Sequence, residues 1–421
     1  MKSLNDEIDS KKELKEAILP VVYSYKQKRE EIFSRTDKKE LQDRLKGIKE
    51  NAINHLMQLK QEAITALQNN GFKVVEAKDA KAARKAILEI IGDEKKIIKS
   101  KSNAANEIGL RDALKDKDLI ETDLGDFLVD IMREQEIHPV LPAIHLQPQK
   151  MADALFRLTG ERVFPKPEAI LASARKYLRG KITGAKVGIS GANVITADGT
   201  VMILENEGNV SLVSRIPEKH IIITGFEKIA PTKEDALVIA KSAAVYGTAQ
   251  DFPVYVNFIS GPSKTADIQD IMLTGAQGAK EVYVILLDNG RSEMLKSDFK
   301  DVLFCINCGA CLNFCPVYHQ ITDRYGKEYY GSRGVLTALF SHSIESAYES
   351  GAYFCTLCQA CKENCPAGID LPALMKLLRE KMIKQGIQPE GAAKMINNIR
   401  QYGNPFGKLK EGEMPKGLYC C

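Results

Sequence analysis

Two short runs of cysteines are the part of this sequence with the clearest chemistry. Each run has the spacing C-x2-C-x2-C-x3-C followed by Pro, and the runs occupy residues 305–316 and 355–366. This is the ligand spacing of bacterial [4Fe–4S] clusters. Three closely spaced thiolates can wrap around one face of a cubane, while the fourth Cys, before a Pro that fixes the backbone, points into a different pocket. The sequence therefore predicts two [4Fe–4S] clusters.

The fourth cysteine of each run is expected to bind the cluster of the other run. The predicted ligands of cluster 1 are Cys305, Cys308, Cys311 and Cys365, and those of cluster 2 are Cys315, Cys355, Cys358 and Cys361. Structural zinc would leave the third Cys of each run and the Cys-Pro pair unexplained. Disulfides fit poorly because the sequence does not resemble that of a secreted protein. Free buried thiols would not recur so regularly.

Length and composition indicate a globular protein of two or three domains. The chain has 421 residues and a formal net charge of only +4, which gives no indication of nucleic-acid or anionic-membrane binding. No apolar run is long enough to span a bilayer, and the first residues lack an apolar signal core. All ten cysteines lie at or after position 305. Thiols that serve metal rather than disulfides lead us to expect a cytoplasmic protein.

Residues 1–68 are expected to form a helical N-terminal arm. Apolar residues recur at helical spacing over 14–25, where Pro20 is expected to kink or divide the helix. A cleaner amphipathic stripe covers 41–59. The arm is either a helical hairpin packed on the next domain or a docking arm for a partner subunit. We favour the packed hairpin because such stripes mostly belong to a core.

Residues 69–298 are expected to form an α/β domain. Strands are predicted at 72–77, 96–100, 186–190, 201–204, 220–224 and 282–287, and helices at 80–91, through 110–114, at 167–178 and at 235–245. The last two strands are continuous apolar runs, which is typical of strands buried on both faces. The alternation of strands and helices predicts a layered domain with a largely parallel sheet.

A polar segment after one of these strands is a candidate ligand pocket. Asp198-Gly199 predicts a hairpin turn, and the strand that follows it ends in a polar group, Glu205, Asn206, Glu207 and Asn209. Ligands of α/β proteins usually bind at such strand ends. Glu205 and Glu207 would share a face if the strand continued that far. A solvated polar loop is an equal alternative, because no base–nucleophile geometry is fixed.

A second polar turn, residues 261–267, is expected to close the same pocket. It lacks the Walker A spacing, and no strand is followed by G-x-G-x-x-G, so we predict no nucleotide site. The six histidines form no metal-binding pattern, and there is no G-x-S-x-G nucleophile motif.

Residues 299–385 are expected to form an all-helical two-cluster ferredoxin domain, followed by a C-terminal tail over 386–421. Helical stripes follow Gly334 and the Asp370 cap, so helices flank both cysteine loops. Cys420 and Cys421 have no spaced companions and are expected to be spare thiols.

Two cations near the cysteine runs are candidates for tuning the clusters by charge. Arg333 and Lys362 lie between and within the runs, and positive charge near a cluster shifts its potential. The alternative for both is a solvated side chain.

The α/β segment resembles the LUD domain, named for lactate utilisation. The resemblance is carried by Gly225-Phe-Glu-Lys-Ile-Ala-Pro-Thr, by Gly261-Pro-Ser-Lys-Thr-Ala-Asp-Ile and by residues 99–103, 107–110, 121–125, 142–145 and 189–209. Together with the cysteine runs, it makes the chain similar to the LUD-domain iron–sulfur subunits of the lactate-utilisation (LutB-type) family. The similarity covers about residues 40 to 385, and the C-terminus beyond 371–384 is short compared with the family.

The resemblance implies a fold, a cofactor module and partners. The LUD fold is similar to that of CoA-transferases and 5-formyltetrahydrofolate cyclo-ligase. The two-cluster module is similar to the helical ferredoxin modules of heterodisulfide reductase and succinate dehydrogenase. The family subunit works with a cysteine-rich, heterodisulfide-reductase-like subunit and a second LUD protein, and the complex oxidises L-lactate to pyruvate.

We therefore expect an electron-transfer subunit of an oxidoreductase complex rather than a self-sufficient enzyme. No flavin or nicotinamide motif is present, so a two-electron cofactor must come from elsewhere, for example from an attached flavoprotein. One alternative is a relay subunit of a heterodisulfide-reductase-like or flavin-containing complex with another substrate. Another is a LUD domain that handles acyl or carboxylate substrates itself, with Glu205 or Glu207 as nucleophile or base. A third is a scaffold that only holds the clusters near partners.

Overall fold

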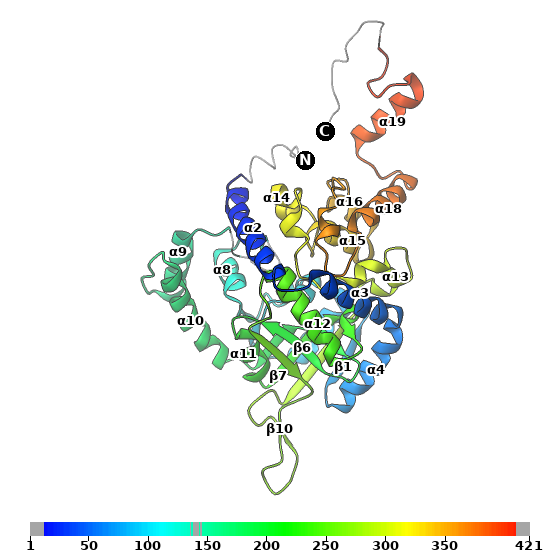
Figure 1. Cartoon of the computed structure of the whole chain (residues 1–421). Coiled ribbons are helices and arrows are strands. Elements are labelled where there is room, and N and C mark those ends of the chain that lie inside the picture. Colours follow the sequence, from blue (N-terminus) through cyan, green and yellow to red (C-terminus); the bar gives the residue numbers. More distant parts are fainter. Residues whose placement is uncertain (1–11, 135, 138–142, 144, 410–421) are drawn as a thin grey trace.

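A computed structural model describes residues 12–134, 136–137, 143 and 145–409 (Figure 1). Cys420 and Cys421 lie outside the described residues, as do the side chain of Leu14 and the start of the 142–145 motif. The two cysteine loops lie in a helical module that covers one end of a pair of β-sheets (Figure 1). Within the described ranges, no helix combines the length and the apolar character needed to cross a membrane.

A six-stranded sheet forms the centre of the α/β part, and every neighbouring pair of strands in it is parallel. Its strands, in spatial order, are β1 (Lys73–Ala77), β12 (Glu281–Leu287), β7 (Lys219–Gly225), β4 (Val187–Gly191), β2 (Lys96–Lys99) and β3 (Asp118–Glu121). The apolar strands β7 and β12 lie side by side in the interior, where helices and a second sheet cover both faces. The predicted largely parallel α/β sheet is confirmed.

A second, mixed sheet of four strands lies against the first, and the sequence did not predict it. Its order is β8 (Ile229–Ala230), β5 (Val194–Thr196), β6 (Val201–Glu205) and β9 (Tyr255–Ile259). Strands of two or three residues are too short to show an alternating pattern. The predicted turn at Asp198-Gly199 does join β5 to β6, with Gly199 in the left-handed conformation at φ +76°.

Alternation along the strands divides the core into two layers. Ile221 and Ile223 of β7 pack with α5 (Ala80–Ile91), while Ile222 belongs to the core shared with the second sheet. The other helices of this part are α6 (Asn103–Glu107), α7 (Leu110–Ala113), α8 (Leu124–Met132), α9 (Pro148–Thr159), α10 (Pro167–Thr183), α11 (Asn209–Arg215), α12 (Lys233–Ala243) and α13 (Arg291–Leu295). The helix expected after the strand at 96–100 and through 110–114 is divided into α6 and α7 at Gly109, whose φ is +60°.

The N-terminal helices pack onto the rest of the molecule. They are α2 (Lys12–Phe33), α3 (Lys38–Asn54) and α4 (Leu56–Asn69). Pro20 does not divide α2, because it lies at an exposed position where water can bond the carbonyl that lost its partner. The stripe over 41–59 is divided at His55 and is largely buried. Contacts of α3 with both α12 and the cysteine module favour the packed arrangement.

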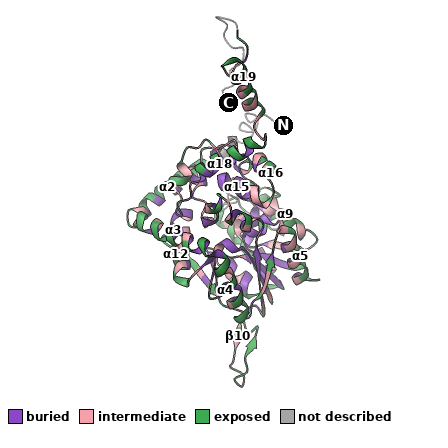
Figure 2. Cartoon of the chain, turned by 90° about the vertical axis from the view of Figure 1, so that its right-hand side faces the viewer, coloured by how far each residue is buried: buried purple, intermediate pink, exposed green. Residues whose placement is uncertain are grey.

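The named elements after residue 299 are all helical in the part that the structure describes, and one isolated β-bridge joins Gly326 to Tyr330. They are η3 (Lys300–Phe304), η4 (Leu312–Phe314), α14 (Tyr318–Ile321), η5 (Thr322–Arg324), α15 (Gly331–Ser341), α16 (Ile344–Glu349), α17 (Ala360–Glu363), α18 (Leu371–Lys384) and α19 (Glu390–Tyr402). Asp370 caps α18 by accepting the Ala373 N–H at 3.0 Å, as predicted. Helix α19 was not predicted, and it projects from the body with no buried residue (Figure 2).

Candidate iron–sulfur site and adjoining cavity

The four cysteines assigned to cluster 1 line one cavity. Three of them come from the loop between η3 and η4, and Cys365 comes from the loop before α18. The cavity they line has a volume of about 80 Å³. Burial, together with Cys305 and Cys365, raises the pKa of the Cys308 thiol to about 12. Thiols that are far apart in sequence therefore lie close enough to act on one another.

The four cysteines assigned to cluster 2 form a second group. Burial raises the pKa of the Cys361 thiol to about 12, and the neighbouring thiols that add to this are Cys355, Cys315 and Cys358. Cys358 is exposed, whereas the other described cysteines are partly buried. Cys311 of the first group also acts on Cys361, so the two groups adjoin. Each group therefore combines three cysteines of one sequence run with the fourth cysteine of the other run.

The two loops repeat one backbone conformation. Left-handed residues stand two and four positions after the first Cys of each run: Asn307 and Gly309, then Leu357 and Gln359. In the first loop this turns the Asn307 N–H toward the Cys305 Sγ at 3.4 Å. N–H groups also approach the trailing cysteines of both runs, from Tyr318 to Cys315 Sγ and from Ile369 to Cys365 Sγ, each at 3.4 Å. Hydrogen bonds to sulfur are typical of iron–sulfur sites.

One further observation fits a cubane at this site. Arg333 is 8% exposed and lines the cavity of cluster 1, and its Nε and Nη1 atoms have no hydrogen-bond partner. A group with several sulfur atoms, placed between the four thiols, would accept these orphaned donors.

The structure separates the two cations proposed for charge tuning. The Arg333 guanidinium lies 3.6 Å from the centre of the Tyr329 ring and faces the cluster 1 cavity. The Lys362 side chain is about half exposed, and its Nζ pairs with Asp370 Oδ2 at 2.5 Å. The prediction of a solvated side chain therefore holds for Lys362 and is wrong for Arg333, because α15 carries Arg333 into the interior.

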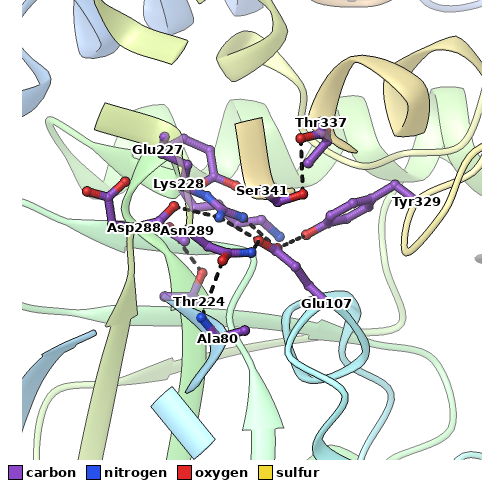
Figure 3. A network of polar contacts seen from close by, with 12 residues as sticks. Ala80, Glu107, Thr224, Glu227, Lys228, Asp288, Asn289, Tyr329, Thr337 and Ser341 are labelled. Carbon is purple, nitrogen blue, oxygen red and sulfur yellow. Dashed lines mark hydrogen bonds and ion pairs between the residues drawn. The ribbon is translucent and has the colours of Figure 1, made fainter. Parts of the chain in front are cut away.

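A buried ionic network joins the sheets to the cysteine module, and Figure 3 shows Glu107 near its centre. Arg291 Nη1 and Nη2 bond both carboxylate oxygens of Glu107 at 2.8 and 2.7 Å, and its Nε bonds Glu227 Oε2 at 2.5 Å. Tyr329 Oη donates to Glu107 Oε2 at 2.6 Å (Figure 3). The Lys49 Nζ of α3 donates to the Glu227 carbonyl at 2.8 Å. Sequence reasoning assigned no role to these residues, although Glu107 and Glu227 lie within the motifs of the LUD resemblance.

A larger cavity of about 520 Å³ lies at the carboxyl ends of the strands. Gly191 of β4 and Ile223 of β7 line it, and so do all four predicted pocket residues, Glu205, Asn206, Glu207 and Asn209. Its far wall is formed by Ile306, Asn307 and Cys308 of the first cysteine loop, which also line the cluster 1 cavity. The strand-end cavity and the cluster 1 cavity therefore share a wall.

The two glutamates of this cavity differ in environment. β6 ends at Glu205, so the two side chains do not continue one strand face. The Glu205 carboxylate accepts the Val210 N–H at 2.6 Å and Asn257 Nδ2 at 2.7 Å, and so fastens α11 to the sheet. Glu207 accepts the Leu124 N–H at 3.1 Å, and burial together with Asp123 raises its pKa to about 7. Glu205 is a structural residue, whereas Glu207 can exchange a proton near neutral pH.

The polar turn at 261–267 does not close this cavity. It belongs to a hairpin of β10 (Lys264–Thr265) and β11 (Leu273–Thr274), which extends from the opposite end of the molecule (Figure 1). β9 runs antiparallel to β6, pairing Tyr255 with Glu205 and Ile259 with Val201. The chain therefore leaves β9 at the end remote from Glu205, which is why this prediction was wrong.

A parallel α/β sheet domain joined to a module with two groups of four cysteines defines an iron–sulfur protein with an electron-transfer role. The chain belongs to the LUD domain family, which it matches over residues 60–287, and it carries a 4Fe-4S dicluster domain over residues 301–369. The predicted resemblance is thus confirmed, and with it the presence of iron–sulfur chemistry.

Two curated relatives and one solved structure show the range of the similarity. The uncharacterized electron transport protein YkgF of Escherichia coli is 31% identical over 381 residues, which cover 89% of this chain and 78% of that protein. Lactate utilization protein B of Geobacillus sp. is 32% identical over 343 residues, covering 80% and 70%. A DUF162 family protein from Deinococcus radiodurans matches with 12% identity and a TM-score of 0.30, over 55% of this chain and 98% of that structure.

Proposed function

We propose that the chain is the electron-transfer subunit of a multi-subunit complex that oxidises L-lactate to pyruvate. Its similarity to proteins named for lactate utilisation and for electron transport supports this function. The proposed partners are a cysteine-rich, heterodisulfide-reductase-like subunit and a second LUD protein, or a flavoprotein that supplies the two-electron step. The proposed compartment is the cytoplasm, where reducing conditions keep thiols available for metal.

The proposed cofactors are two [4Fe–4S] clusters with crossed ligands. Cluster 1 takes the three leading cysteines of the first run and Cys365, and cluster 2 takes those of the second run and Cys315, which agrees with the two groups of neighbouring thiols. When bound, each cluster supplies one-electron transfer. The loops themselves place N–H groups at the sulfur ligands, and Arg333 supplies buried donors and a positive charge.

The observation that carries this proposal is the wall shared by the two cavities. A ligand in the strand-end cavity would lie directly against the loop of Cys308. The helical turn η2 (Ala244–Thr248), which follows α12, approaches this loop so closely that a Cβ on Gly247 would stand 2.7 Å from the Cys308 carbonyl oxygen. A side chain there would push the loop away. The LUD domain is thus built to hold a cavity and a cluster in contact.

Addition of L-lactate to the assembled complex should reduce the clusters. We expect the EPR signal of reduced [4Fe–4S] clusters to develop under anaerobic conditions when partners isolated with the chain are present, and to stay absent when the chain alone is mixed with L-lactate. The physical reason is that each proposed cluster takes up one electron at a time, whereas oxidation of lactate to pyruvate releases two, and the sequence carries no flavin or nicotinamide motif that would accept them together. A complex that is reduced by another substrate and not by L-lactate would replace the substrate and keep the relay function.

A second candidate function, in which the LUD domain handles an acyl or carboxylate substrate itself, is favoured by the pKa of about 7 at Glu207. A carboxyl group titrating there suits general acid–base catalysis. In that case Glu207→Gln should lower turnover at this cavity by about 100-fold or more, with the iron content unchanged. Glu205→Gln is the structural comparison: it should cost about 1–3 kcal/mol in the free energy of unfolding, because one of the two acceptor oxygens becomes an NH2 group that faces the donors of Val210, Ser211 or Asn257.

A further inference from the structure

Buried positive charge is distributed unequally between the two cysteine groups. Arg29, Lys49, Lys228 and Arg333 all act electrostatically on cysteines of cluster 1. Arg29 and Lys49 are each only 3% exposed. These two come from the N-terminal helices α2 and α3, whereas Lys228 belongs to the α/β part and Arg333 to α15 of the cysteine module. Three separate parts of the chain therefore place cations near one site.

These cations are held mainly by aromatic rings and backbone carbonyls, although burial lowers the pKa of Lys49 to about 8 and also lowers the pKa of Lys228. Arg29 lies over aromatic rings, 4.9 Å from the centres of Tyr246 and Phe314, and its Nε has no hydrogen-bond partner. Lys49 and Lys228 donate to backbone carbonyls, of Glu227 at 2.8 Å and of Ala192 at 3.3 Å. Carbonyl oxygens and rings stabilise a cation without cancelling its charge.

The nearby carboxylates do not balance these four charges. Arg291 pairs with both Glu107 and Glu227, so one of these two negative charges is left over, and Glu227 also acts on Lys49, Lys228 and Arg333. Glu328 contributes a second negative charge at the cavity, because its partner His342 carries a charge only when protonated. Glu136 lines the cluster 1 cavity, but burial and the neighbouring Asp126 raise its pKa to about 7, so it is only partly ionised near neutral pH. The surroundings of cluster 1 are therefore net positive.

Cluster 2 has no comparable set of charges among the described residues. The electrostatic neighbours of Cys315 and Cys361 are other cysteines and backbone N–H groups. Arg379 donates to the Cys355 carbonyl at 2.5 Å, but it is only partly buried, and Lys362 is exposed and paired with Asp370. Charges that face water are screened, whereas buried charges act at nearly full strength.

We propose that cluster 1 has the higher reduction potential of the two clusters, set by the buried cations Arg29, Lys49 and Arg333 together with the partly buried Lys228, so that a single electron on the chain rests beside the strand-end cavity. This inference rests on the proposed ligands of two clusters. A cubane held by four thiolates is a net anion and gains negative charge on reduction, so nearby cations favour the reduced state. Exposure of Cys358 to water favours reduction of cluster 2, but we expect contact with water at one ligand to have a smaller effect than three buried cations and a fourth that is partly buried.

Redox titration followed by EPR tests this order in the full-length holoprotein. Two midpoints are expected in the wild type. Arg333→Gln should lower the upper midpoint, which is that of cluster 1. At a fixed solution potential the ratio of reduced to oxidised cluster 1 should fall about tenfold, which corresponds to a midpoint shift of about 59 mV for one electron. The lower midpoint should not move. Arg333→Lys keeps the positive charge, so its upper midpoint should stay close to that of the wild type. Lys362→Gln should move neither midpoint.

The outcomes separate the order of potentials from the ligand assignment. A shift of the lower midpoint in Arg333→Gln, or of neither, overturns the order. If Arg333→Gln loses a cluster, Lys228→Gln replaces it and must shift the upper midpoint in the same direction. A wild-type iron content of about four atoms per chain would instead contradict the two-cluster assignment itself.

Discussion

Replacing single cysteines by alanine should divide the eight predicted ligands into two groups that cross the sequence runs. Cys311→Ala and Cys365→Ala should lose the same EPR signal, and Cys315→Ala and Cys361→Ala should lose the other. In each variant the iron content should fall from about eight to about four atoms per chain, because a cubane needs four ligands. The reason is the cavity in which Cys365 joins the thiols of the first run, 50 or more positions away in sequence.

The grouping itself is the decisive result. If each run held its own cluster, Cys311→Ala and Cys315→Ala would share a phenotype, which would contradict the crossed ligands. The surviving signal in each variant shows that the module still folds. Cys420→Ala with Cys421→Ala serves as the matched control, since these cysteines have no spaced companions and their loss should leave iron at about eight atoms per chain.

Local patterns predicted the cysteine loops and the main strands, because the signals for both lie within a few residues. The spacing of each run located the two cysteine loops, in which left-handed residues follow Cys305 and Cys355, and continuous apolar runs predicted β7 and β12. The position of the 261–267 turn depends instead on the antiparallel pairing of β9 with β6, two strands whose paired residues lie 50 or more positions apart in the sequence. That prediction therefore failed.

The buried charges were hidden from sequence reasoning for another reason. Arg29 and Lys49 lie at helical spacing from the buried apolar residues of α2 and α3, next to Tyr25 and Ile32 and next to Leu45 and Ile53, but a cation at such a position is normally solvated. Only the packing of these helices on neighbouring elements reveals that the two cations are buried. Arg333 was named from its proximity to the cysteine runs, but no pattern distinguished it from Lys362. Residues that surround a cofactor come from elements far apart in the sequence. Which of them meet at the site is decided by tertiary packing and not by any local sequence pattern.

Arg291→Met should be among the most destabilising single substitutions, with a loss of about 3–5 kcal/mol in the free energy of unfolding. Arg291 is buried and holds two buried carboxylates, Glu107 and Glu227. Methionine fills much of the volume but leaves both negative charges without a cation. The double variant Arg291→Met/Glu107→Gln should recover part of the loss, because one of the stranded charges is removed with its partner. Lys186→Met, which breaks an exposed ion pair with Glu218, should leave the unfolding midpoint unchanged.

The pH dependence tests the electrostatic cause of this loss. Burial opposes ionisation of Glu107, but Arg291 overcomes it and holds the pKa at about 2, below the ordinary 4.5. Because the pKa of Glu107 is lower in the folded than in the unfolded state, its ion pair with Arg291 stabilises the fold fully above about pH 4.5. This stabilisation is lost only as the pH falls toward 2, so in the wild type it should be constant from pH 8 to pH 5. In Arg291→Met the main influence opposing burial is lost, although the hydrogen bonds from Tyr329 and Asn289 remain, and we expect the pKa of Glu107 to rise above 4.5. Acid then neutralises the stranded carboxylate, and the gap from wild type in urea unfolding should narrow between pH 8 and pH 5, with intact clusters checked by absorbance. A gap that stays constant over this range would mean that Arg291 stabilises the interface through packing rather than charge.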